Sequence, residues 1–304
     1  MKVVFFGTPE FAASVLQFLF ENGVNIVAVI SKPDRPKGRS GTPVPTPVKK
    51  IGEMINPKIP VFQPELVSDP AFADVLAAFK ADLFVIVAYG EIIKQHLLDM
   101  PKIGCINLHA SLLPKYRGAA PIQKAIIEGE KESGITIMHM VKKMDAGDII
   151  SQVKVDITPE MSFEDLEAKL CVVGEEELLR VIREFEVAVP KRIPQDQSQV
   201  TFAPKIELED CEIKWSLPAQ RIHDLVRAVN PHPGAWCYVT VRGESKRLKI
   251  FKTRIGDTPF QKGNLIVPAG DKSLELLEVQ LEGKKRMSSG ELMRGITDLL
   301  FLSQ

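Results

Sequence analysis

Short apolar runs alternate with amphipathic stretches over the first half of the chain. The runs lie at residues 3–6, 26–30, 83–87, 104–108, 135–141 and 149–155. A short, continuous apolar run bounded by turn residues is typical of a buried strand. Because helical patterns separate most of the early runs, we expect an α/β fold with a Rossmann-like, mostly parallel sheet and helices on both faces.

Two helices in this region carry N-terminal signals. After the first strand, Thr8 is expected as the N-cap and Pro9 at the first helical position. A long amphipathic helix is expected over residues 161–185, with Ser162 as its cap. The turn that begins at Gly7 lacks the glycines of a dinucleotide-binding fingerprint, so dinucleotide binding is disfavoured.

The pattern changes near residue 189. Residues 189–198 are polar and contain prolines, which is typical of a linker. Short strand patterns then follow at close spacing and predict a small barrel, with strands at 236–241, 248–251, 264–267 and 274–281 and helices at 217–229 and 288–295. We therefore expect a first domain over residues 1–188, a linker over 189–206 and an OB-like β-barrel C-terminal domain over 207–304.

The segment from Gly104 to Pro114 holds the candidate catalytic chemistry. It predicts a strand that ends in a loop, with Asn107 and His109 pointing to the same side of an extended backbone. An amide and an imidazole thus meet at the carboxyl end of a strand, where open α/β sheets bind ligands. An amide donates to a developing oxyanion, and an imidazole moves a proton near neutral pH. Asp145, in a turn after a later strand, is a candidate to hold the imidazole in one tautomer, which suggests acyl transfer.

Motifs around these residues resemble those of the 10-formyltetrahydrofolate-dependent formyltransferases. The signature is Asn-x-His-x-Ser-Leu-Leu-Pro at 107–114, continuing into Tyr-Arg-Gly-Ala-Ala-Pro-Ile at 116–122. Three more motifs are similar to the branch of this family that acts on methionyl initiator tRNA: Val-Phe-Phe-Gly-Thr-Pro-Glu-Phe-Ala at 4–12, Lys-Pro-Asp-Arg-Pro-Lys-Gly-Arg at 32–39 and Lys-Lys-Arg-Met-Ser at 284–288. The likeness runs from residue 1 nearly to the C-terminus.

The resemblance implies an activity and a set of site residues. It implies transfer of the formyl group of 10-formyltetrahydrofolate to the α-amino group of methionyl initiator tRNA, for translation initiation and without a metal. Asn107 would then stabilise the oxyanion, His109 would accept the proton of the attacking amine, and Asp145 would pair with His109. The implied folate-binding residues are Ser111, Leu112, Leu113, Pro114, Tyr89 and Gly90. For Tyr89, a strand-end residue with no ligand role remains an alternative.

Two basic segments point to the phosphate backbone of a tRNA. The loop over residues 31–50 is basic and rich in proline, and the resemblance implies that it contacts the acceptor end through Arg39 and Lys37. Over residues 214–254, basic residues far outnumber acidic ones, which is the footprint of a polyanion partner. The candidate tRNA-binding residues there are Lys246, Arg247 and Lys249. A solvated face, balanced by acidic residues elsewhere in this neutral chain, is the alternative.

Composition limits the class of protein and the compartment in which it acts. With 304 residues, 45% of them hydrophobic, the chain can form two domains with sizeable cores. Its four cysteines are widely spaced, which favours free thiols over disulfides or a zinc site. No apolar run approaches the roughly 18 residues of a membrane span, and no signal-peptide core is evident. We expect a cytoplasmic monomer without membrane contact. Ser111 lacks the Gly-x-Ser-x-Gly elbow of a covalent nucleophile.

Three other functions remain open. Formylation of a small amine, such as glycinamide ribonucleotide or an amino-sugar nucleotide, is disfavoured by the basic loop, the second domain and the lack of an appended dehydrogenase domain. An RNA-binding module would use the barrel alone and leave Asn107, His109 and Asp145 unexplained. Hydrolysis of the formyl donor would replace the amine with water, although such hydrolases commonly carry a regulatory domain before the catalytic one.

Overall fold

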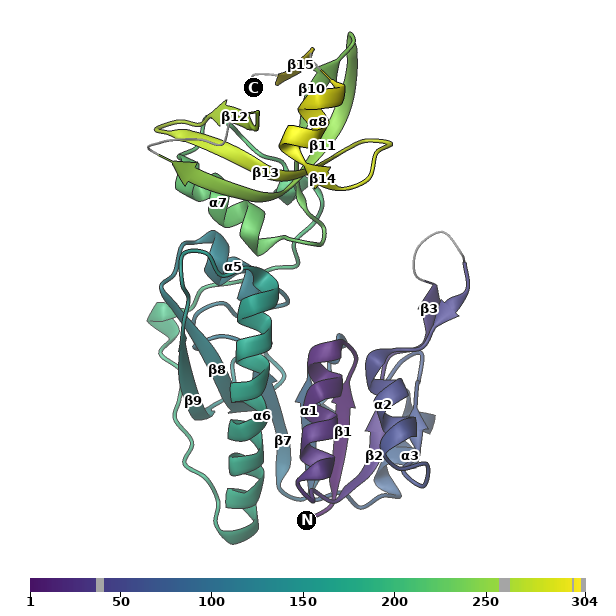
Figure 1. Ribbon diagram of the computed structural model, residues 1–304. Coiled ribbons are helices and arrows are strands. Elements are labelled where there is room, and N and C mark those ends of the chain that lie inside the picture. The colour runs from purple at the N-terminus through teal and green to yellow at the C-terminus, as the bar shows by residue number, and fades with distance from the viewer. Residues whose placement is uncertain (37–40, 257–262, 297, 302–304) are drawn as a thin grey trace. The chain divides into compact units, whose positions relative to one another are not determined.

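The computed structural model describes residues 1–36, 41–256, 263–296 and 298–301 (Figure 1). The chain forms two compact units, each assembled from three stretches of sequence. The first contains Met1–Gly118, Ser133–Asp156 and Glu167–Phe202, and the second contains Ala119–Glu132, Ile157–Leu166 and Ala203–Gln304. The functional boundaries expected at residues 188 and 206 stay a prediction, because the units are defined by contacts and not by activity.

Strands and helices alternate as the apolar pattern predicts. The strands are β1 Val3–Gly7, β2 Ile26–Ile30, β3 Arg35–Pro36, β4 Pro43–Val44, β5 Val61–Phe62, β6 Leu83–Val87, β7 Gly104–His109, β8 Glu132–His139, β9 Ile149–Asp156, β10 Ala235–Val241, β11 Glu244–Gly256, β12 Leu265–Pro268, β13 Ser273–Leu281, β14 Met287–Ser288 and β15 Leu299–Phe301. The α-helices are α1 Glu10–Glu21, α2 Pro47–Ile55, α3 Pro70–Ala77, α4 Gln95–Leu98, α5 Pro121–Ile127, α6 Phe163–Val187, α7 Ala219–Ala228 and α8 Ser289–Gly295. Short 3₁₀ turns cover Gln197–Gln199 and Glu209–Cys211.

A seven-stranded sheet in the order β5-β2-β1-β6-β7-β8-β9 is the frame of the first unit. The strands from β5 to β7 in this order run parallel, whereas β8 pairs antiparallel with β7. Parallel strands end at the same edge, so the loops after β1, β2, β6 and β7 meet there. The expectation of a mostly parallel α/β sheet is confirmed.

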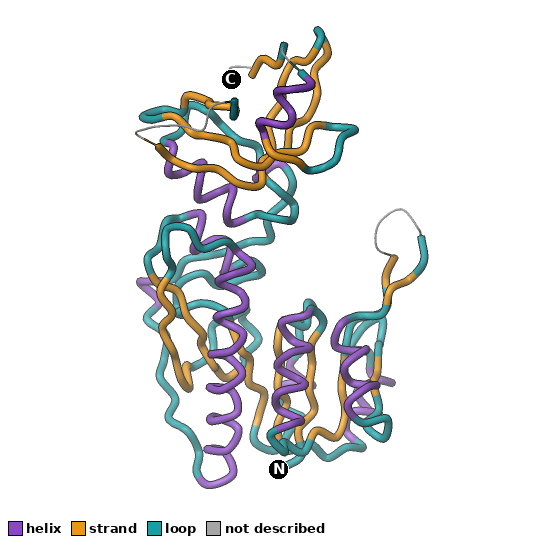
Figure 2. Tube along the Cα trace, viewed as in Figure 1, coloured by secondary structure: helices purple, strands orange, loops and turns teal. Residues whose placement is uncertain are grey.

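Helices cover both faces of this sheet. Alternate side chains of each strand point to opposite faces, so each strand packs against helices on both sides. On one face, Phe84 belongs to a buried cluster with Leu76 of α3 and Leu97 of α4. On the other face, α6 comes so close that a Cβ at Gly174 would lie 3.0 Å from Leu108. Figures 1 and 2 show α1, α2 and α6 along one side of the strands, which confirms the expected layers.

The second unit is built on an antiparallel sheet in the order β12-β13-β11-β10-β15, with β14 added to β13. The pairing of β11 with β13 shifts register between Ile250 and Thr253, and such irregularities bend a sheet. Helix α7 packs against α5 and β11, and Arg221 of α7 donates to the carbonyl oxygen of Ile127 at 3.0 Å. The expected small C-terminal β-domain is confirmed as a bent, half-barrel sheet.

One helix start differs from the prediction. Helix α1 begins one residue after Pro9, and the side chain of Thr8 caps nothing. Its hydroxyl instead donates to the carbonyl oxygen of Tyr89 at 2.8 Å, so Thr8 joins the ends of β1 and β6. The cap of α6 is confirmed, because the amide of Asp165 donates to Oγ of Ser162 at 3.3 Å and its carboxylate accepts from the Ser162 amide at 2.9 Å.

Substitution of Gly134 in β8 tests how closely this sheet is packed. A Cβ there would lie 2.2 Å from the carbonyl oxygen of Val153 and 2.5 Å from Cδ2 of Leu112. Because a backbone oxygen cannot move aside, we expect Gly134→Ala to lower the free energy of unfolding by roughly 1–3 kcal/mol or more, as overpacking does. Urea and thermal unfolding measure the change. Gly295→Ala is the control, since nothing lies within 4 Å of its Cβ position. Equal stability of the two variants would show that β8 is not packed as described.

Candidate functional site

Strand β7 carries two polar side chains at its carboxyl end. Asn107 and His109 are 9% and 6% exposed, so both are held largely out of water. Across the antiparallel partner β8, Met138 lies opposite Asn107 and Thr136 lies opposite His109. The expected placement of an amide and an imidazole at the end of a buried strand is therefore what the structure has.

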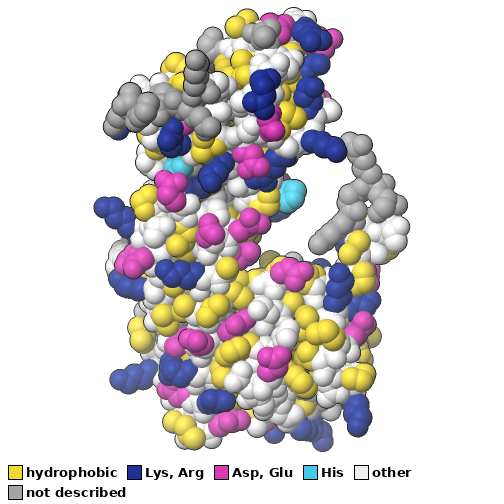
Figure 3. Space-filling model, viewed as in Figure 1, with side chains coloured by type: hydrophobic (Ala, Val, Ile, Leu, Met, Phe, Trp, Pro, Cys, Tyr) yellow, Lys and Arg dark blue, Asp and Glu magenta, His cyan; other side chains and the backbone are white. Residues whose placement is uncertain are grey.

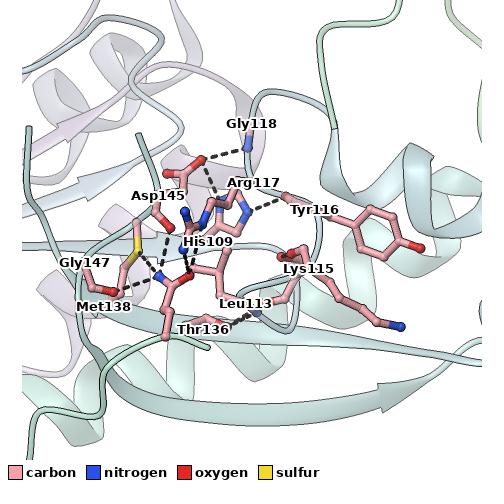
Figure 4. A network of polar contacts seen from close by, with 12 residues as sticks. His109, Leu113, Lys115, Tyr116, Arg117, Gly118, Thr136, Met138, Asp145 and Gly147 are labelled. Carbon is pink, nitrogen blue, oxygen red and sulfur yellow. Dashed lines mark hydrogen bonds and ion pairs between the residues drawn. The ribbon is translucent and has the colours of Figure 1, made fainter. Parts of the chain in front are cut away.

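The imidazole of His109 lies between two oxygen atoms (Figure 4). Its Nε2 is 2.9 Å from the carbonyl oxygen of Tyr116, and its Nδ1 is 3.9 Å from Oδ2 of Asp145. A carbonyl oxygen only accepts hydrogen bonds, so Nε2 carries a proton and donates it to Tyr116. In the neutral ring, Nδ1 is then the atom with the lone pair, and it faces Asp145. The backbone of Tyr116, rather than Asp145, selects the tautomer.

Asp145 lies on a turn with an unusual backbone. Its φ is +48°, in the left-handed region that is uncommon for residues other than glycine. The amide of Gly118 donates to Oδ2 at 2.8 Å and so orients the carboxylate. Two residues later, a Cβ at Gly147 would lie 1.7 Å from the carbonyl oxygen of His139, so only glycine fits there. The turn therefore places a carboxylate against the imidazole through backbone geometry and one amide.

Two functional candidates were missed by the sequence analysis. Arg117 is 1% exposed, and its Nε and Nη2 donate to Oε1 of Gln195 at 3.1 and 2.6 Å. Nε2 of Gln195 donates to the carbonyl oxygens of Asp145 and Gly147 at 2.9 and 2.8 Å. Burial lowers the pKa of the Arg117 guanidinium, and the negative charge of Asp145 opposes that change. Arg117 stood inside the family motif, but nothing in the polar segment around Gln195 indicated a site.

The predicted folate-binding segment after β7, residues 111–114, is held in place by hydrogen bonds within the protein. The hydroxyl of Ser111 donates to the carbonyl oxygen of Lys115 at 2.7 Å, and Ser111 is fully buried. Oγ1 of Thr136 donates to the carbonyl oxygen of Ser111 at 2.6 Å and accepts from the amide of Leu113 at 3.1 Å. Leu113 is buried, whereas Leu112 and Pro114 are partly exposed, so those two have surface to offer a ligand.

Tyr89 belongs to the hydrophobic core. Its ring is 2% exposed and makes an edge contact with Phe6, with ring centroids 5.6 Å apart. Its hydroxyl is buried without a hydrogen-bond partner in the described part of the chain. The next residue, Gly90, is exposed and has a φ of +86°. In this structure, the surface available to a ligand after β6 is therefore the backbone near Gly90 and not the Tyr89 ring.

A cavity of about 340 Å³ lies beside the Asp145 turn. Ala146 and Gly147 line it together with Cys105 of β7 and His139 of β8. Burial lowers the pKa of His139 to about 4, so this imidazole is neutral at physiological pH. Its Nε2 is buried with no hydrogen-bond partner among the described residues. The cavity wall also contains the charged residues Asp99, Asp148 and Arg192, so it offers a ligand both polar and apolar contacts.

The predicted tRNA contacts on β11 do not share one face of that strand. Lys37 and Arg39 lie outside the described residues. Lys246 pairs with Glu244 at 3.0 Å and points to the opposite side of β11 from Arg247 and Lys249. The guanidinium of Arg247 lies 4.5 Å from the ring centroid of Trp236, and Nζ of Lys249 donates to the carbonyl oxygen of Pro233 at 2.8 Å. Each described lysine or arginine of this set thus has a local partner, and its contact with tRNA stays a prediction.

Over the residues that the structure describes, no three His, Cys, Asp or Glu side chains come together as metal ligands would. Within the same residues, every helix is too short or too polar to cross a bilayer. All four cysteines are free.

Models of known protein families match both parts of the chain. The model for "Formyl transferase" matches residues 1–182, and that for "Formyl transferase, C-terminal domain" matches residues 205–297. A methionyl-tRNA formyltransferase of Protochlamydia amoebophila (strain UWE25) is 63% identical over 306 residues, with 98% of this chain and 96% of that relative covered. The first model alone spans more than half of the chain.

Two solved structures are similar in fold. HypX from Aquifex aeolicus in complex with tetrahydrofolic acid matches with a TM-score of 0.65 at 16% identity, over 96% of this chain and 47% of that chain. A methionyl-tRNA formyltransferase from Clostridium thermocellum matches with a TM-score of 0.58 at 15% identity, over 92% of this chain and 98% of that chain. At these identities the likeness shows the fold alone, whereas the family models and the 63% identical relative show the family. The chain belongs to the formyl transferase family, within the group of the methionyl-tRNA formyltransferases.

Proposed function

We propose that this protein transfers the formyl group of 10-formyltetrahydrofolate to the α-amino group of methionyl initiator tRNA. The products are N-formylmethionyl-tRNA, which serves translation initiation, and tetrahydrofolate. The observation that carries the proposal is the pair of Asn107 and His109 at the carboxyl end of β7, with Asp145 beside the imidazole, in a chain 63% identical to a methionyl-tRNA formyltransferase.

The geometry supports a direct transfer between two bound substrates. The neutral α-amine attacks the formyl carbon, and the Asn107 amide donates to the oxygen as it gains negative charge. His109 accepts the amine proton at Nδ1, the ring atom with the lone pair, while Nε2 keeps its hydrogen bond to Tyr116. Asp145, 3.9 Å from Nδ1, stabilises the imidazolium. When the tetrahedral intermediate collapses, N10 of the folate leaves and takes the proton from Nδ1.

The binding residues follow as part of the same proposal. The folate lies along Ser111, Leu112, Leu113 and Pro114 and the backbone at Tyr89 and Gly90. The tRNA backbone is held by Lys37 and Arg39 of the basic loop and by Lys246, Arg247 and Lys249 of β11. The protein acts as a cytoplasmic monomer.

The choice of acceptor tests the function directly. We expect formyl transfer from 10-formyltetrahydrofolate to methionyl initiator tRNA, and at least about 100-fold slower transfer to glycinamide ribonucleotide or to an amino-sugar nucleotide, because binding energy from remote parts of the correct substrate is used to orient the reacting centre. Acid-gel separation of formylated and free tRNA measures the first reaction. Rapid release of formate without any acceptor would instead identify a hydrolase.

Asn107→Ala tests the oxyanion role. Removal of one oxyanion donor typically lowers turnover by roughly 10² to 10³, and the Michaelis constant for tRNA should change little. Steady-state kinetics at saturating folate separates the two effects. Asn22→Ala, on an exposed helix end, is the matched control and should behave like the parent. Near-normal turnover of Asn107→Ala would remove this residue from the mechanism.

The coupling of His109 to Asp145 is tested by a double-mutant cycle. His109→Ala and Asp145→Asn should each lower turnover strongly, because the carboxylate acts through the imidazole. The double variant should therefore be little worse than His109→Ala, since residues that act as a unit are not additive. Added imidazole should partly restore His109→Ala but not the double variant. Fully multiplicative losses would show that the two side chains act independently.

A further inference from the structure

We propose that Gln195 is a positioning residue of the active site, which ties the Asp145 turn to Arg117 and so holds the Asp145 carboxylate beside His109. This inference rests on the proposed function, because His109 and Asp145 are the residues that Gln195 would position. It also assigns a catalytic purpose to a segment that the sequence analysis interpreted as a linker.

The chemistry of the partners fixes the orientation of the Gln195 amide. Arg117 can only donate, so the amide oxygen must face its Nε and Nη2, at 3.1 and 2.6 Å. The carbonyl oxygens of Asp145 and Gly147 can only accept, so the amide nitrogen must face them, at 2.9 and 2.8 Å. A side chain of this length that accepts at one oxygen and donates twice from its nitrogen is glutamine. Glutamate would satisfy Arg117 and repel both carbonyl oxygens.

Burial raises the free-energy cost of losing any of these hydrogen bonds. Gln195 is 7% exposed and Arg117 is 1% exposed, so water is not available to replace a lost partner. A buried group left unsatisfied costs the full desolvation of that group, whereas an exposed one costs little. The arrangement of the Asp145 turn is therefore strongly favoured over one in which its carbonyl oxygens face elsewhere.

The Asp145 turn has a geometry that needs such support. Its left-handed backbone at Asp145 is unfavourable for an L-residue, and such conformations persist only when the surroundings hold them. Gln195 binds the turn on both sides of the residue that follows Asp145, through the carbonyl oxygens of Asp145 and Gly147. The side chain of Asp145 is oriented separately, by the amide of Gly118.

The same segment also holds the other neighbour of the imidazole. The amide of Tyr116 donates to Oγ1 of Thr201, and the amide of Arg117 donates to the carbonyl oxygen of Thr201, both at 2.9 Å. The segment from Gln195 to Thr201 therefore binds both neighbours of the imidazole. It binds the turn whose carboxylate faces Nδ1, and it binds the loop after β7 whose carbonyl oxygen accepts from Nε2. Figure 4 shows Tyr116 and Asp145 on either side of His109.

The test compares Gln195→Met with the parent as full-length protein. Methionine keeps the size and loses the amide, so the carboxylate should shift and turnover should fall by roughly 10- to 100-fold, as small misplacements of catalytic groups do. The Michaelis constant for formyl-folate should change less than about 3-fold. Gln195→Glu should lose turnover as well, because it keeps only the Arg117 contact. Gln199→Ala is the matched control, since Gln199 is exposed and its side-chain amide donates to Asp196 at 2.7 Å.

The same substitution in Asp145→Asn protein separates a positioning role of Gln195 from a purely structural one. In Asp145→Asn protein, Gln195→Met should lower turnover by less than about 3-fold, because the group that it positions is already disabled. Hydrogen exchange at the Gly118 amide should accelerate in Gln195→Met and not in Gln199→Ala. Equal losses in both backgrounds, or parental turnover of Gln195→Met, would overturn the inference. If Gln195→Met does not fold, Gln195→Glu is compared in the same two backgrounds. A parent protein that does not formylate methionyl-tRNA would refute the proposed function instead.

Discussion

A carbonyl oxygen accepts hydrogen bonds and cannot donate them. At Tyr116 this constraint decides which ring nitrogen of His109 carries the proton. Because Nε2 of His109 must donate to that oxygen, the lone pair of the neutral ring is at Nδ1, facing Asp145. The proposed proton acceptor, Nδ1, and the carboxylate proposed to stabilise it therefore lie on one side of the ring. In a Ser-His-Asp triad the carboxylate holds one nitrogen and the other nitrogen reacts. Here a backbone carbonyl takes the holding role.

The fold supplies the conditions that this arrangement requires. Parallel pairing with β6 buries β7 and carries Asn107 and His109 to the edge where loops converge. Close packing at Gly134, Gly147 and Gly174 leaves little freedom in the elements that support that edge. Inside such a site, fixed dipoles and charges act more strongly than in water. The site therefore holds a small number of polar side chains in nearly fixed positions. Such a site suits a reaction in which the enzyme orients two bound substrates and forms no covalent intermediate.

Much of this could be predicted from the sequence, and the exceptions have physical causes. Strand alternation and the position of a strand end are local properties, so the strand β7, the placement of Asn107 and His109 at its carboxyl end, and the helices on both faces of the sheet were predicted correctly. The tautomer was not, because it depends on a backbone carbonyl that any residue could provide. Gln195 was missed because its partners lie in two turns distant in sequence. Strand alternation sends Lys246 and Arg247 to opposite faces of β11, which a count of basic residues along the sequence does not reveal, and their contact with tRNA stays a prediction.

The tautomer of His109 is the most direct test, since the proton pathway, the role of Asp145 and the need for its positioning all follow from it. Nitrogen-15 NMR of histidine-labelled protein distinguishes a protonated from an unprotonated ring nitrogen, and His109→Gln identifies the resonance. At a pH where this imidazole is neutral, we expect a proton on Nε2 and none on Nδ1, in the parent and in Asp145→Asn alike. A proton on Nδ1, or a tautomer that changes in Asp145→Asn, would contradict this expectation.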